Sequence, residues 1–166
     1  YVVIHLVSQT WQGVPWQHLL YILNPPEVDP NESNALMLIS GGSWKAEWGS
    51  DGPETIEVPR EAVLLASVAL EVKTPVAILK QVPFQPMFDG LKEDALIAHT
   101  FQKFFETSDR DWPLLPVMAR AASAALDAVV GATKDEWGLS IDGFTVTGAS
   151  KRGWTTYLVG ATDPRV

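Results

Sequence analysis

Short apolar runs and longer runs with helical spacing alternate along this chain. Residues 1–7 and 16–23 are rich in β-forming side chains, and the turn-like link at 9–15 predicts that they form an antiparallel hairpin. Residues 35–39 and 75–79 are continuously apolar, which is typical of strands buried on both faces. Residues 144–147 predict one more strand.

Helices are predicted over residues 59–72, 92–106 and 114–130, and after Ser150 to about residue 160. Residues 163–166 are interpreted as the entry to another strand. Two hairpin strands followed by alternating strands and helices predict an α/β fold with a mostly parallel sheet and flanking helices. No linker or repeat divides the chain, so residues 1–166 are expected to form a single domain.

Composition excludes several classes of protein. The net charge of −8 argues against nucleic acid, because phosphates would be repelled. The lack of cysteine excludes disulfides and thiol catalysis. No uninterrupted apolar run reaches the roughly 20 residues of a membrane span. There is no Gly-x-Gly-x-x-Gly motif, phosphate loop or metal-ligand spacing, so a cofactor-binding domain is disfavoured and neither cofactor nor metal is expected.

The candidate catalytic residues lie within residues 144–154. There three β-formers lead into Gly148, Ala149 and Ser150, and a helical pattern follows. A serine on such a strand–turn–helix junction has the setting of a nucleophile elbow, with the backbone N–H of Lys151 available to an oxyanion. The usual spacing is Gly-x-Ser-x-Gly, whereas here Arg152 stands two residues after the serine and Gly153 three. The alternative is an ordinary strand-to-helix turn with Ser150 as a helix N-cap.

A second glycine segment follows the predicted strand at 35–39. Glycines directly after a buried strand allow backbone N–H groups to turn toward a ligand. Gly42 and Ser43 are therefore candidates for the other half of an oxyanion hole, and the alternative is a plain strand-exit turn.

Segments 39–43, 93–100, 147–156 and 163–166 together resemble the PhoPQ-activated pathogenicity-related proteins, which are exported or secreted proteins of the α/β-hydrolase type. Arg152 is part of that pattern. The resemblance implies the N-terminal half of a hydrolase-type sheet, Ser150 as nucleophile, and a periplasmic or secreted location. It implies no substrate.

A serine nucleophile needs a histidine base and an acid, which follow the serine in α/β-hydrolases. Here His5, His18 and His99 all precede Ser150, and each is interpreted as structural. Asp163 is interpreted as a turn residue. We therefore expect the chain to be truncated at its C-terminal side, with the triad histidine and acid beyond residue 166 in the remainder of the parent chain.

The expected function is a serine hydrolase that cleaves an ester or amide in a small-molecule or peptide substrate. Trp44, Trp48 and Trp154 are candidate pocket walls, with core packing as the alternative for each. Lys151 and Arg152 either hold an acidic substrate group or are surface or structural cations. The alternative function is a non-catalytic secreted or periplasmic binding or signalling factor on the same scaffold.

Overall fold

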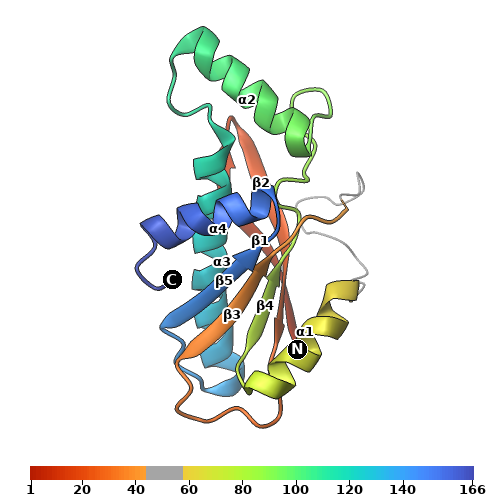
Figure 1. Ribbon diagram of the computed structural model, residues 1–166, viewed down its shortest axis with the longest axis vertical. Helices are drawn as coiled ribbons and strands as arrows, with labels where there is room; N and C mark the ends of the chain where they lie inside the picture. The colour runs from red at the N-terminus through yellow and green to blue at the C-terminus, as the bar shows by residue number, and fades with distance from the viewer. Residues whose placement is uncertain (44–57) are drawn as a thin grey trace.

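The elements of the chain alternate between strands and helices after a leading hairpin (Figure 1). The computed structural model describes residues 1–43 and 58–166. Its strands are β1 (Val2–Trp11), β2 (Val14–Leu23), β3 (Asn34–Ile39), β4 (Val76–Leu79) and β5 (Gly143–Gly148). Its helices are α1 (Arg60–Val72), α2 (Glu93–Thr107), α3 (Leu114–Trp137) and α4 (Lys151–Thr162).

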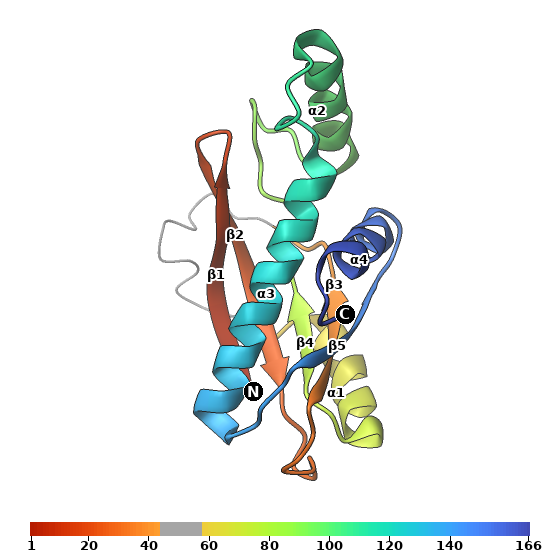
Figure 2. The same ribbon diagram turned by 90° about the vertical axis from the view of Figure 1, so that its left-hand side faces the viewer.

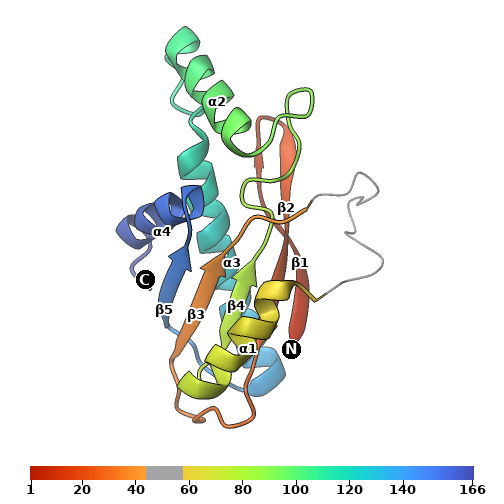
Figure 3. The same cartoon turned by 45° about the vertical axis from the view of Figure 1, so that its right-hand side comes forward.

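The five strands form one sheet in the order β1-β2-β4-β3-β5 (Figure 3). β1 pairs antiparallel with β2, and β2 pairs antiparallel with β4, whereas β3 pairs parallel with both β4 and β5. The sheet is therefore mixed, and the prediction of a mostly parallel sheet is wrong. The reason is that the hairpin joins the sheet through β2, so that two of the four pairings are antiparallel.

Helices cover both faces of the sheet (Figure 2). On one face α1 packs Leu65 and Ala69 against Tyr21 and Ile78. On the other face α3 and α4 pack against the larger core. α2 lies beyond the carboxyl ends of β3, β4 and β5, as Figures 1 and 3 show. The carboxyl edge of the parallel strands is thus the meeting place of α2, α4 and the segments that leave β3 and β4.

α3 is the main core helix. It is 24 residues long and apolar enough, by length and composition alone, to cross a membrane. Over half of its most apolar stretch is buried within the structure. Small side chains such as Ala121, Ala122 and Ala125 are fully buried and allow close contact with the sheet. Its hydrophobicity is accounted for by this packing.

The predicted elements match the observed ones with three differences. β1 continues to Trp11, so only Gln12 and Gly13, both with positive φ, form the hairpin turn. α3 passes through Gly131 and ends only where Gly138 adopts a left-handed C-cap. Residues 163–166 form a turn instead of a strand entry, because the Asp163 carboxylate bonds the backbone and side chain of Arg165.

Candidate active site

Ser150 lies at a sharp junction between β5 and α4. β5 ends at Gly148, α4 begins at Lys151, and Ser150 has φ 58° and ψ −124°. A positive φ is costly for a residue with a Cβ atom, of the order of 1–3 kcal/mol. Ser150 is nevertheless an exposed residue. A strained and exposed serine between a strand and a helix is the backbone geometry of a nucleophile elbow.

The structure tests the alternative interpretation of Ser150, that of a helix N-cap. Ser150 occupies the N-cap position of α4, but its side chain makes no capping hydrogen bond. Its φ also departs from the extended backbone that a serine N-cap adopts. The N-cap interpretation is therefore wrong. Within the described residues the Ser150 hydroxyl makes no hydrogen bond to the protein, so its Oγ is available to a reactant.

Two glycines allow β5 and α4 to meet at this junction. A Cβ atom on Gly148 would lie 2.8 Å from the carbonyl carbon and oxygen of Arg152, closer than side chains tolerate. A Cβ atom on Gly153 would lie 3.0 Å from the Gly148 carbonyl oxygen. The second close approach falls at Gly153, while the side chain of Arg152 extends to the Val82 carbonyl oxygen and to Glu93. This accounts for a glycine three residues after the serine instead of two.

The segment Ser40–Ser43, which we call the glycine loop, leaves the sheet beside this elbow. β3 and β5 are adjacent, with Ile39 opposite Gly148. The carbonyl oxygens of Ser40, Gly41 and Ser43 accept hydrogen bonds from Val82 N, Gln81 N and Gln81 Nε2. By contrast, the backbone N–H groups of Gly42 and Ser43 donate to no other described residue. The N–H of Lys151 is likewise without an acceptor in the described part of the chain.

Lys151 and Arg152 are both paired with α2. Lys151 Nζ lies 2.7 Å from Glu93 Oε2 and 2.9 Å from Asp94 Oδ1, and Arg152 Nη2 contacts Glu93 Oε1. Partial burial would lower the pKa of Lys151, but hydrogen bonds to Glu93 and Asp94 outweigh burial and raise it. These pairs favour a structural role over the holding of an acidic substrate, because both cations are already neutralised. Sequence reasoning missed Glu93 as the partner, although the family-like segment 93–100 begins there.

A second, partly buried ion pair lies next to the glycine loop. Lys80 Nζ lies 2.6 Å from Glu61 Oε1 and 3.4 Å from Ser40 Oγ. Partial burial would raise the pKa of Glu61, but hydrogen bonds from Lys80, from its own backbone N–H and from Ser40 outweigh burial and lower it. A Cβ atom on Gly42 would lie 3.1 Å from Lys80 Cε, so the lysine stem packs against that glycine.

Comparison with known sequences assigns the chain to a family. The profile of the PhoPQ-activated pathogenicity-related protein family matches residues 1–166, the whole chain. The chain belongs to this family. It is also similar to autocrine proliferation repressor protein A of Dictyostelium discoideum, at 34% identity over 182 residues covering 99% of this chain. The chain spans 33% of that relative's length.

Among solved structures, the chain is compared with acetyl xylan esterase from Aspergillus awamori. The overlap covers 99% of this chain and 48% of the esterase chain. The TM-score is 0.44 at 13% sequence identity. This overlap does not establish a shared fold. The family assignment therefore rests on the sequence matches.

The three histidines of this family member are engaged away from Ser150. His18 is buried, with Nε2 3.0 Å from Ser8 Oγ and Nδ1 3.0 Å from the Lys80 carbonyl oxygen. Burial lowers its pKa to about 4 against the opposing effect of the Lys80 hydrogen bond. His5 Nε2 contacts Gln17 Oε1 at 3.0 Å. The His99 ring centroid lies 5.1 Å from that of Phe88, next to Trp112.

Asp163 has a structural setting. Its carboxylate accepts hydrogen bonds from Arg165, including one of 2.7 Å from Nη2, and these lower its pKa to about 2 despite burial. The Arg165 carbonyl oxygen in turn accepts a hydrogen bond from Phe144 N at 2.8 Å. The family-like segment 163–166 therefore ties the end of α4 to the start of β5.

The structure describes one of the three candidate tryptophans, Trp154. Trp44 and Trp48 lie outside the described residues. Trp154 is 52% exposed on α4, one turn from the still more exposed Tyr157, so it is not a core residue within the described structure. A role for Trp154 as a pocket wall stays a prediction. No cluster of metal-binding side chains occurs in residues 1–43 and 58–166.

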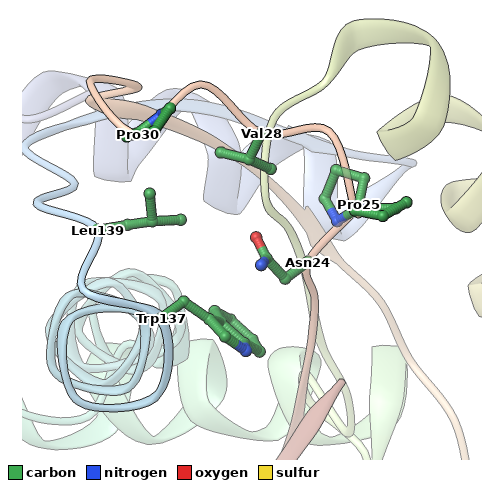
Figure 4. Close-up of a pocket in the computed structure, with 7 residues that line it drawn as sticks. Asn24, Pro25, Val28, Pro30, Trp137 and Leu139 are labelled. Carbon is green, nitrogen blue, oxygen red and sulfur yellow. The ribbon is translucent and has the colours of Figure 1, made fainter.

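A pocket of about 290 Å³ lies at the other end of the sheet (Figure 4). Asn24, Pro25 and Val28 line it from the loop after β2, facing Trp137 and Leu139 at the end of α3. Because Leu23 is paired with Val76, that loop is at the amino end of β4, whereas Ser150 follows the carboxyl end of β5. Ser150 does not line this pocket.

Proposed function

We propose that this chain carries the nucleophile and the oxyanion hole of a serine hydrolase of the α/β-hydrolase type, acting on an ester or amide. The observation that supports the proposal most strongly is the backbone of Ser150. Its left-handed conformation costs free energy, it is exposed, and its hydroxyl does not cap the helix that it precedes. A residue kept in such a conformation without a capping role is most simply explained by chemistry at its Oγ atom.

In the proposed reaction Ser150 Oγ attacks the carbonyl carbon of the substrate and gives up its proton to a base. The carbonyl oxygen becomes an oxyanion, which accepts hydrogen bonds from the N–H groups of Lys151 and of Gly42 or Ser43. These groups suit that role because they donate to no other described residue. Collapse of the tetrahedral intermediate expels the protonated leaving group, and water then hydrolyses the acyl-enzyme through the same base.

We propose that the base and its orienting acid come from the remainder of the parent chain, beyond residue 166. Two observations support this. His5, His18 and His99 are bonded or stacked elsewhere, and the similar Dictyostelium protein is about three times as long as this chain, since the chain covers 33% of it. Trp44, Trp48 and Trp154 are proposed as walls of a pocket for a small-molecule or peptide substrate.

Turnover of a small activated ester by the full-length protein tests this proposal. We expect wild type to hydrolyse p-nitrophenyl acetate with a burst of acyl-enzyme, and Ser150→Ala to abolish the burst. Ser67→Ala is the matched control, because Ser67 is exposed on α1, on a different helix from the elbow, and among the described residues its hydroxyl bonds only the Val63 carbonyl oxygen. A burst that survives in Ser150→Ala would contradict the assignment of the nucleophile.

The second candidate is a non-catalytic binding or signalling factor that acts outside the cytoplasm, in the periplasm or as a secreted protein. It is favoured by one observation, that the 34% identical relative is named an autocrine proliferation repressor. The two candidates differ in their dependence on Ser150. A factor that only binds keeps its biological effect in Ser150→Ala, whereas an effect that requires hydrolysis is lost.

A further inference from the structure

Glu93 contacts both of the cations that follow Ser150. We propose that Glu93 is a positioning residue for the elbow: its carboxylate holds the first turn of α4 and, through Arg152, the backbone of the glycine loop. The inference rests on the proposed function for its catalytic consequence. The contact network itself is independent of that function.

The contacts of Glu93 are close and shielded. Oε2 lies 2.7 Å from Lys151 Nζ, and Oε1 contacts Arg152 Nη2. The three side chains are only 24%, 12% and 15% exposed. Charge-assisted hydrogen bonds in such a site are stronger and more directional than those at an open surface. Loss of the carboxylate would leave two shielded cations without their shared partner.

Arg152 carries the restraint from Glu93 to three other segments. Its backbone belongs to the first turn of α4, and its Nε donates a 2.5 Å hydrogen bond to the Val82 carbonyl oxygen after β4. A Cβ atom on Gly41 would lie 2.3 Å from Arg152 Nη2, so the guanidinium lies directly against the Gly41 backbone. The segment that presents Gly42 and the turn that presents Lys151 are therefore held by one side chain.

The backbone of Glu93 is itself unusual. Glu93 is the first residue of α2, yet its φ is +57° and its N–H donates to the Pro83 carbonyl oxygen at 3.0 Å. Helix formation does not require a positive φ at a first residue. The strained conformation holds the Glu93 carboxylate where it reaches Lys151 and Arg152 together. Glu93 is thus a strained residue whose ion pairs reach the two residues that follow the strained Ser150.

Lys80 and Glu61 restrain the glycine loop from its other side, through Ser40 and the packing of the Lys80 stem on Gly42. With the loop held at Gly42 by Lys80, which follows β4, the position of Lys151 relative to it depends mainly on Arg152 and Glu93, because the other partner of Lys151, Asp94, is 85% exposed. Loss of Glu93 should therefore change the distance between the two proposed donors and not unfold the loop.

The experiment uses the full-length protein and the substitution Glu93→Gln, which keeps the side-chain shape and removes the charge. Glu106→Gln is the matched control, because Glu106 is also an α2 glutamate in an ion pair, with Lys103 at 2.9 Å, but far along the helix. Two quantities are measured. One is the second-order rate constant for labelling of Ser150 by an uncharged fluorophosphonate, and the other is amide hydrogen exchange in peptides covering residues 40–43 and 148–153.

We expect Glu93→Gln to slow labelling by about 10- to 100-fold, the size of effect that misplacement of reacting groups produces. Exchange in both peptides should become about tenfold faster or more. Glu106→Gln should change neither quantity. Arg152→Lys, which keeps the cation and loses the planar fork, should behave like Glu93→Gln and serves as the second variant if Glu93→Gln fails to fold.

The outcomes separate the inference from the proposed function. Unchanged exchange in both peptides of Glu93→Gln overturns the positioning role, whatever the labelling shows. Faster exchange with an unchanged labelling rate also overturns it, because the restraint would then not act on the nucleophile. If wild type is not labelled at all while Glu93→Gln exchanges faster, the hydrolase proposal fails and the restraint on the elbow stands as a structural contact.

Discussion

The close approach of β5 and α4 at Gly148 predicts that a side chain at this position destabilises the fold. In Gly148→Ala the new Cβ atom would lie 2.8 Å from the carbonyl carbon and oxygen of Arg152 and 2.9 Å from its Cβ atom. Two of these three atoms belong to the backbone of α4, whose first turn cannot retreat without moving Ser150. Overpacking of this kind costs about 1–3 kcal/mol. The reduced freedom of the unfolded chain returns about 0.4–1 kcal/mol.

We therefore expect Gly148→Ala to lower the free energy of unfolding by about 1–2 kcal/mol. Gly131→Ala is the matched control, because Gly131 is inside α3 and a Cβ atom there meets nothing within 4 Å. The control should raise the free energy of unfolding by about 0.5–1 kcal/mol through helix propensity.

Urea unfolding of the full-length protein, followed by tryptophan fluorescence and linear extrapolation, measures both variants. The fluorophosphonate labelling rate of Gly148→Ala should also fall, since the clash displaces the elbow. If Gly148→Ala were as stable as Gly131→Ala, with an unchanged labelling rate, the close packing of β5 on α4 would be refuted.

Two further predictions concern the dependence of stability on pH. Because its folded-state pKa of about 2 is below the ordinary 3.8, ionised Asp163 stabilises the fold above about pH 4. Asp163→Asn should therefore lower the free energy of unfolding by about 2 kcal/mol at pH 7, and this difference from wild type should disappear as the pH falls from 4 to 2. A difference that is constant with pH would contradict the ion pair. Because the pKa of His18 is about 4 in the fold and 6.5 ordinarily, protonation favours the unfolded chain. Wild type should thus lose about 3 kcal/mol relative to His18→Gln between pH 6.5 and 4, and parallel pH profiles would show that His18 is not held neutral.

The sequence predicts most elements of this fold because their signals are local. The apolar runs at β3 and β4 and the glycine and proline turns around them determine strand positions without reference to the rest of the chain. Whether neighbouring strands pair parallel or antiparallel is not a local property. It depends on which neighbour β2 selects, and pairing with β4 makes the sheet mixed. Nothing in the pattern of residues 16–23 encodes that choice.

The candidate site also has one part that local sequence predicts and one part that it does not. The strand–turn–helix junction is predictable because Gly148, Ser150 and Gly153 are close together in the chain, and the two glycines are required by the close approach of β5 and α4. The partners of the elbow are not predictable from spacing, because Glu93 lies 58 residues before Lys151 and Lys80 lies further back still. Only a folded chain brings these charges to one edge of the sheet. The family-like segment that begins at Glu93 marks the place without stating the contact.

The measurement that tests the central claim most directly is covalent labelling of the full-length protein with a fluorophosphonate, followed by mass spectrometry of the modified peptide. It requires no knowledge of the substrate and reports only on an activated serine. We predict one modified residue, Ser150, with labelling lost in Ser150→Ala and retained in Ser67→Ala. A folded full-length protein that is not labelled at Ser150 would contradict the account and would favour the binding or signalling factor.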